Sequence, residues 1–293
     1  MSWRQRFGLK AVPLPRGACG RTFYDGDEAF LALQRVFAWL AADPGLGVLT
    51  GEPGVGKTAA LRHLCDGLPR TSHRILYLGD SALRPHALYS MLADLLGVRP
   101  TPRARLLAEL RRVLVRLVDE QQIQPIVILD DAQRLSDDVL AELASLANID
   151  FDGRDLVTIW LLGHPLLERR LAMQQHAALA QRVIHYARLG PKTDRAAFDA
   201  MLAHGLKAAG ALRPLLTGPA HELLFRASRG VPRLASNLLR AALRIADERD
   251  LTTLDDHVML AAIDSLRLAP ATSHPTPDPA PQSLTERGTK SRK

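Results

Sequence analysis

The chain has 293 residues, with 38 lysines and arginines against 31 aspartates and glutamates, which gives a formal net charge of +7. A chain of this length can bury a large core in one large or two modest domains. It contains neither an apolar run long enough to span a bilayer nor a secretory leader pattern, so we expect a cytoplasmic protein with no membrane partner. The positive charge comes mainly from arginine, which suits phosphate and nucleic-acid contacts but is equally typical of a GC-rich genome.

Residues 7–21 are rich in proline and glycine, which predicts an irregular arm packed on the main domain. A helix is expected from Asp27, with an apolar face of helical period, and residues 43–45 end it. The next residues, 47–50, predict the first strand. The residues of the apolar face are Phe30, Leu33, Phe37 and Leu40.

Residues 51–58 fit the phosphate-loop pattern G-x-x-x-x-G-K-[ST] without a gap. Gly51, Gly54 and Gly56 would let the backbone take positive φ and turn its N–H groups toward a nucleotide's phosphates. Lys57 would reach the β- and γ-phosphates, and the Thr58 hydroxyl would bind Mg²⁺. A chance glycine-rich turn is the alternative, but an apolar strand precedes this loop and helix formers follow it. The predicted ATP-binding residues are Gly51, Glu52, Pro53, Gly54, Val55, Gly56, Lys57, Thr58 and Ala59.

Further along the chain, apolar strands alternate with amphipathic helices, which predicts an α/β fold with a parallel sheet covered on both faces. Strands are expected at 74–79, 125–131, 156–162 and 183–189, with helices at 58–66, 88–95, 103–121, 137–146, 166–173 and 177–182. After residue 190 only helices are expected. We therefore predict a five-stranded nucleotide-binding domain with its arm (1–190), a small all-helical lid domain (191–268) and a disordered, proline-rich, basic tail (269–293).

The carboxyl ends of parallel strands meet at one edge of the sheet, where ligands bind. The third predicted strand ends in Asp130 and Asp131, and His164 follows the fourth. Asp130 would hold Mg²⁺ together with Thr58, and Asp131 would orient or deprotonate the attacking water. The alternative for this acidic pair is a helix-capping turn, but its place at the end of an apolar strand after a phosphate loop favours catalysis.

Together these features resemble the AAA+ ATPases. The order and spacing of several short motifs are similar to the branch that contains the secretion ATPase ExeA and the transposition regulators TniB, TnsC and MuB. The similarity covers about residues 1–268. The motifs lie at residues 3–13, 129–135, 162–167, 179–183 and 229–233.

The resemblance implies roles for two arginines. Arg233 would be a sensor that reaches from the lid to the phosphates, with a lid-surface arginine as the alternative. Arg182 would be the finger that enters a neighbouring subunit's site, with Arg169 and Arg170 as runners-up, so activity would require a homo-oligomeric ring or filament. The chain departs from the pattern in two places. Asp131 stands where a glutamate is usual and His164 where relatives carry glutamine, and both put the rate of hydrolysis in doubt.

The preferred function is an ATP-dependent regulator that assembles on duplex DNA and recruits a transposase. Basic residues between the second and third strands would contact DNA phosphates, although a solvated helix face is the simpler explanation for them. The alternatives are an ExeA-like secretion ATPase and a nucleotide-gated protein-interaction switch with no DNA role. The candidate DNA contacts are Arg84, Arg99, Arg103 and Arg105.

Overall fold

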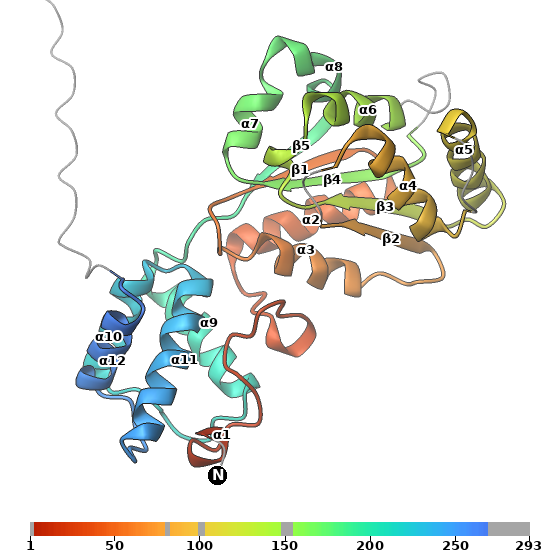
Figure 1. The fold of residues 1–293 in the computed structure, drawn as a ribbon. Helices are drawn as coiled ribbons and strands as arrows, with labels where there is room; N and C mark the ends of the chain where they lie inside the picture. Colours follow the sequence, from red (N-terminus) through yellow and green to blue (C-terminus); the bar gives the residue numbers. More distant parts are fainter. Residues whose placement is uncertain (1–2, 80–82, 99–102, 148–154, 269–293) are drawn as a thin grey trace, which may run out of the picture.

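A five-stranded parallel sheet forms the centre of the larger part of the molecule (Figure 1). The computed structural model describes residues 3–79, 83–98, 103–147 and 155–268. The strands lie in the order β2-β3-β4-β1-β5, and every neighbouring pair is parallel, which confirms the predicted fold class. Their bounds are β1 Leu46–Thr50, β2 His73–Leu78, β3 Gln124–Leu129, β4 Thr158–Gly163 and β5 Val183–Arg188.

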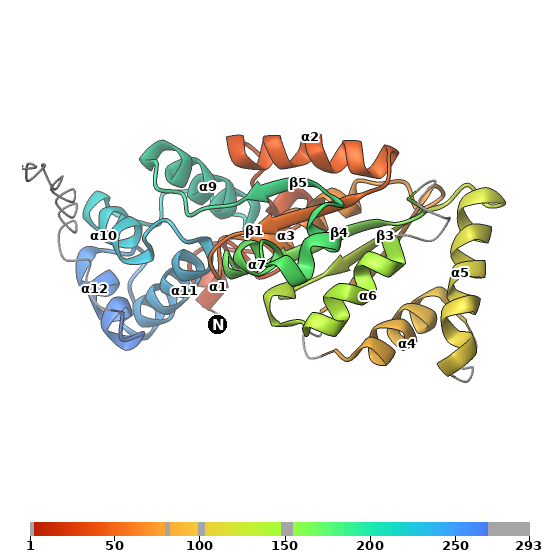
Figure 2. The same cartoon turned by 90° about the horizontal axis from the view of Figure 1, so that it is seen from above.

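Helices cover both faces of this sheet, as Figure 2 shows for α2 on one side and α4 and α6 on the other. Side chains alternate between the faces of a strand, so Ile126 and Ile128 of β3 pack toward α2 and α3, whereas Val127 and Leu129 pack toward α4, α5 and α6. Because the central strands are buried on both faces, their sequences are continuous apolar runs. The helix bounds are α2 Glu28–Ala42, α3 Lys57–Asp66, α4 Pro85–Leu96, α5 Arg103–Asp119, α6 Asp137–Ala147, α7 Leu166–Leu171 and α8 Ala177–Ala180.

Within the described residues, three short 3₁₀ turns lie in the connections: η1 Gly20–Thr22, η2 Ala132–Arg134 and η3 Gln174–His176. The turn η2 follows β3 directly, and Asp131, which precedes it, has a left-handed backbone with φ of 51°. Aspartate tolerates this conformation better than most residues. The turn therefore redirects the chain immediately after the strand end that carries the acidic pair.

The C-terminal helical region consists of α9 to α12 and has its own apolar core. Its helices are α9 Arg195–Ala208, α10 Gly218–Ser228, α11 Pro232–Glu248 and α12 Asp256–Ser265. The N-terminal arm begins with α1 (Trp3–Arg6) and contributes buried Phe7 and Leu9 to this same core, while Arg6 pairs with Asp247 at 2.7 Å. The arm, which the sequence assigns to the main domain, thus packs in large part against the C-terminal helical region.

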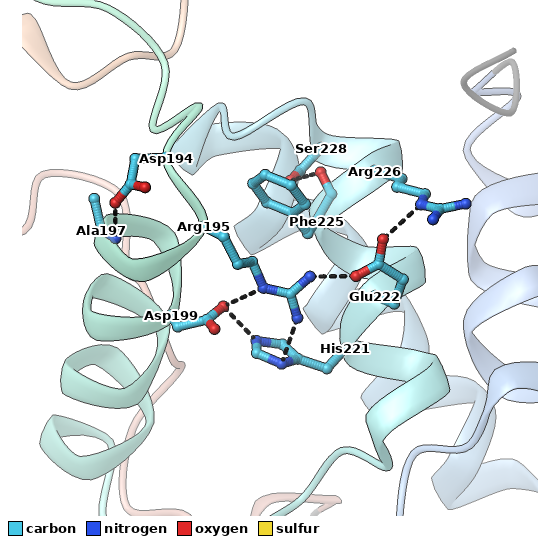
Figure 3. A network of polar contacts seen from close by, with 9 residues as sticks. All are labelled: Asp194, Arg195, Ala197, Asp199, His221, Glu222, Phe225, Arg226 and Ser228. Atoms are coloured by element: carbon cyan, nitrogen blue, oxygen red, sulfur yellow. Dashed lines mark hydrogen bonds and ion pairs between the residues drawn. The ribbon is translucent and has the colours of Figure 1, made fainter. Parts of the chain in front are cut away.

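A charged network joins α9 to α10 within this region (Figure 3). The Arg195 guanidinium donates to Asp199 at 2.8 Å, to Glu222, and to Nδ1 of His221 at 3.2 Å. Arg195 also lies 5.1 Å from the centre of the Phe225 ring. The hydrogen bonds from Arg195 and Arg226 lower the pKa of the Glu222 carboxyl. The lowered pKa favours the ionised carboxylate, which links α10 to α9 through Arg195.

The predicted tail, 269–293, lies outside the described residues. Within the ranges that are described, no helix combines the length and the apolar character needed to cross a membrane.

Candidate functional site

The phosphate loop runs from the end of β1 to the start of α3, and its glycines serve two different needs. Gly54 and Gly56 have φ of 89° and 104°, as the sequence predicts. The same prediction is wrong for Gly51, because its φ is not positive. A Cβ at Gly51 would instead lie 2.2 Å from the Leu189 carbonyl oxygen. Gly51 is therefore required for a close approach between the loop and the chain that leaves β5.

Lys57, the first residue of α3, lies folded over the loop. Its ammonium donates to the carbonyl oxygens of Gly51 at 2.8 Å and Glu52 at 3.2 Å. Burial lowers the pKa of this lysine, and Arg233 also lowers it, whereas Asp130, Asp131 and Glu52 oppose the shift. An arriving phosphate would favour the charged form in the same way as those carboxylates.

The Thr58 hydroxyl donates to Oδ2 of Asp130 at 2.7 Å, which joins α3 to the end of β3. The hydroxyl of Tyr77, near the end of β2, donates to the same oxygen at 3.0 Å. The other oxygen, Oδ1, accepts the Asp131 backbone N–H at 2.9 Å. A hydroxyl and a carboxylate side by side are the hard oxygen ligands that Mg²⁺ takes, together with phosphate oxygens and water. The donor set therefore fits Mg²⁺.

Among the described residues no group of three or more histidine, cysteine, aspartate or glutamate side chains could form a complete metal cage. A metal ion at Thr58 and Asp130 would therefore depend on the nucleotide for further ligands, which is the usual situation for Mg²⁺ bound to nucleotide phosphates.

Asp131 and His164 follow the carboxyl ends of β3 and β4, at the same edge of the sheet as the phosphate loop after β1. Asp131 is exposed, so its carboxylate is accessible to water. His164 follows β4, and its Nε2 lies 3.0 Å from Oε2 of Glu52 in the loop. The structure thus brings together the strand-end residues that the sequence predicts to share one edge.

Arg233 is the second residue of α11, and its backbone N–H donates to the Gly54 carbonyl at 3.2 Å. The contact is close, since a Cβ at Gly54 would lie 2.9 Å from the Arg233 Cβ. A cavity of about 510 Å³ opens beside this contact and is lined by the phosphate loop, the N-terminal arm and α11. Its volume falls within the range of small-molecule sites, roughly 300–1,000 Å³.

The three candidate finger arginines have different surroundings. Arg182 directly precedes β5 and is half-buried. It lies at the opposite end of the sheet from the phosphate loop, because Val183 pairs with Leu46 at the start of β1. Arg169 is exposed on α7. Arg170 binds the carbonyl oxygens of Gln133 at 2.9 Å and Leu135 at 2.7 Å, and it also pairs with Asp137. These contacts within its own chain argue against Arg170 as a finger.

The candidate DNA contacts are only partly described. Arg84 is exposed and directly precedes α4, where its side chain makes no capping hydrogen bond. Arg103 and Arg105 lie in the first turn of α5, but their side chains lie outside the described part of the structure, as does all of Arg99.

Sequence reasoning missed two parts of the site. One is Tyr77, which lies one residue before the end of β2 and could have been found by asking which polar side chains end the neighbouring strand. The other is the arm between Leu14 and Tyr24, which lines the cavity. No local pattern marks the arm, because only the folded chain brings it beside the phosphate loop.

Comparison with known proteins agrees with this geometry. Residues 41–171 match the family model described as AAA domain. The fold is similar to the ADP form of the ORC2 protein of Aeropyrum pernix (TM-score 0.65, 15% identity, 89% of this chain and 72% of that one). It is also similar to a chain of Drosophila ORC bound to DNA (TM-score 0.66, 15% identity, 91% of this chain and 65% of that one). The chain has the AAA+ fold. AAA+ proteins are ATPases, in agreement with the predicted enzyme class.

Among curated proteins, the chain is similar to general secretion pathway protein A of Aeromonas hydrophila. The two are 31% identical over 251 residues, which is 84% of this chain and 45% of that protein. The chain therefore spans less than half the length of this relative. A secretion protein among the relatives supports the predicted resemblance in part, because no transposition protein is among the matches described.

Lys57→Ala should weaken ATP binding by about a hundredfold, because it removes the cation that faces the phosphates and charge-assisted hydrogen bonds contribute strongly. Titration with a fluorescent ATP analogue measures the effect. Arg70→Ala, which removes an exposed positive charge after α3, is the matched control and should bind like the parent protein. Equal dissociation constants for Lys57→Ala and the parent would contradict the claim that this loop binds the phosphates of ATP.

Proposed function

We propose that the protein hydrolyses ATP with Mg²⁺ and acts as a nucleotide-gated switch on a protein partner, in the manner of a secretion-associated AAA+ ATPase. The observation that carries this proposal is the convergence of Lys57, the Thr58–Asp130 pair and Arg233 on one phosphate loop. The similarity to general secretion pathway protein A supports the choice of a secretion-type partner over a transposase.

In the proposed reaction, Lys57 and the N–H groups of the loop bind the β- and γ-phosphates. Asp131 orients a water whose oxygen forms a bond to the γ-phosphorus as the bond to the β-phosphate oxygen breaks, and the water's proton passes to Asp131 or to solvent. Bound Mg²⁺ would neutralise charge on the β- and γ-oxygens. His164, held beside the loop by Glu52, would sense the γ-phosphate.

Arg233 would carry the nucleotide state to the C-terminal helical region. Its backbone already contacts Gly54, its charge acts on Lys57, and it lines the same cavity as the phosphate loop. Arg182 would act in a neighbouring subunit, which makes hydrolysis dependent on a homo-oligomeric ring or filament. Its place at the far end of the sheet from its own phosphate loop supports a role in trans.

Hydrolysis should be slow in the parent protein. The Asp131 carboxylate is one methylene shorter than glutamate, and a misplacement of about 1 Å can lower a rate by about a hundredfold. Asp131→Glu should therefore raise kcat, whereas Asp131→Asn should lower it and leave ATP affinity unchanged. Steady-state phosphate release and nucleotide titration measure the two effects. If Asp131→Asn hydrolyses ATP as fast as the parent, a residue other than Asp131 orients the attacking water.

A second candidate function is ATP-driven assembly on duplex DNA with recruitment of a transposase. Two structurally similar proteins, Drosophila ORC and the ORC1 protein of Aeropyrum pernix, are bound to DNA. In addition, α5 carries arginines that are exposed where their side chains are described, at Arg111, Arg112 and Arg116. Two of these pair with glutamates, Arg112 with Glu109 and Arg116 with Glu120, which reduces the charge available to DNA. We therefore place this candidate second.

Replacing Arg103 and Arg105 together by alanine should weaken binding to all duplex sequences alike. The log–log dependence of affinity on salt, about −0.9 per phosphate contact, should become shallower by up to about 2. Mobility shifts with ATP, ADP and no nucleotide across a salt series measure this. Replacing Lys207 and Arg213, which are exposed in the C-terminal helical region, removes the same charge as a control. No binding to duplex DNA at low salt with a non-hydrolysable ATP analogue would contradict this function.

A further inference from the structure

Gln133, in the turn after the acidic pair, contacts candidate site residues at the ends of two neighbouring strands. Its side-chain amide lies between Asp131 and the backbone of His164. Nε2 donates to Oδ1 of Asp131 at 3.2 Å, and Oε1 accepts the His164 N–H at 2.9 Å. The amide thus bridges the end of β3 to the end of β4.

The orientation of this amide follows from its partners. A backbone N–H can only donate, so the amide oxygen must face His164. The amide NH₂ is then left facing the Asp131 carboxylate, which can only accept while it is ionised. Reversing the amide would place two donors together at His164 and two acceptors together at Asp131. The observed arrangement is therefore the only one in which both contacts are favourable.

Two features outside the amide hold it in place. Gly163, the last residue of β4, leaves room for it, because a Cβ at this position would lie 2.8 Å from Oε1 of Gln133. Arg170 of α7 donates to the Gln133 backbone carbonyl at 2.9 Å and to the Leu135 carbonyl at 2.7 Å. Arg170 thus holds the backbone of the turn η2 in place, and with it the backbone from which the Gln133 side chain extends.

We infer that Gln133 is a positioning residue, which holds the Asp131 carboxylate at a fixed place relative to His164 at the end of β4. This inference rests on the proposed ATP hydrolysis. The contact matters because Asp131 is exposed, has a left-handed backbone, and carries a short carboxylate that must orient water. Gln133 restricts that carboxylate and couples it to His164, whose ring contacts Glu52 in the phosphate loop.

Gln133→Ala should lower kcat by about tenfold to a hundredfold, since it frees the carboxylate from its productive position. Affinity for ATP should stay at the parent value, because Gln133 makes none of the phosphate-loop contacts. Gln133→Glu keeps an acceptor for the His164 N–H but removes the donor to Asp131, so its kcat should also fall. Arg134→Ala, an exposed neighbour in the same turn, is the matched control and should hydrolyse ATP like the parent.

A double-mutant cycle separates positioning from a general structural role. If Gln133 acts through Asp131, Gln133→Ala should have little further effect in an Asp131→Asn background, because contacting residues that act as a unit are not additive. If the separate effects of Gln133→Ala and Asp131→Asn on kcat multiply in the double variant, the two residues act independently and the inference is overturned.

Affinity for ADP with aluminium fluoride, a mimic of the transferring phosphoryl group, gives a readout that does not depend on turnover. The parent should bind fluorescent ADP more tightly with aluminium fluoride than without it. Gln133→Ala should lose most of that gain and keep the affinity for ADP alone. If the parent hydrolyses ATP and Gln133→Ala matches it both in kcat and in the affinity gained with aluminium fluoride, the role of Gln133 is overturned. The proposed ATP hydrolysis would still stand in that case. A parent with neither turnover nor Lys57-dependent binding would overturn the proposed function, and the role of Gln133 with it.

Discussion

The close packing around the phosphate loop is the constraint on which the rest of the molecule depends. Gly51 lies against the carbonyl of Leu189, at the exit of β5, and Gly54 lies against Arg233 at the start of α11. Side chains at these positions would separate the loop from both neighbours. Gly51 and Gly54 therefore seat the loop between the sheet and the C-terminal helical region, and Gly54 combines this close approach with a positive φ.

The sheet, its covering helices and the helical region that follows could be predicted from the sequence because each has a strong local signal. Strands buried on both faces are continuous apolar runs, and α2 and α3 have apolar faces of helical period. The phosphate loop has a sequence pattern of its own, and the acidic pair can be assigned to the same site because the carboxyl ends of parallel strands meet at one edge. These inferences need only the pattern of the chain and the geometry of a parallel sheet.

Other parts of the site depend on contacts between residues far apart in sequence, and no local pattern reports them. The arm contributes Phe7 and Leu9 to the core of the C-terminal helical region although nearly two hundred residues separate them from α9. The amide of Gln133 reaches the His164 backbone across 31 positions. Arg170 was a candidate for action in a neighbouring subunit, yet its partners lie in its own chain, because the sequence cannot show which backbone carbonyls lie within reach.

The central claim is that the phosphate loop and the start of α11 respond to nucleotide together. Hydrogen–deuterium exchange with and without a non-hydrolysable ATP analogue tests it most directly, because exchange reports the local stability of each segment. The account predicts slower exchange in residues 51–58 and in residues 231–237 of the parent protein. In Arg233→Ala, residues 51–58 should stay protected while the protection of residues 231–237 is lost. Protection of the phosphate loop alone in the parent protein would contradict the account.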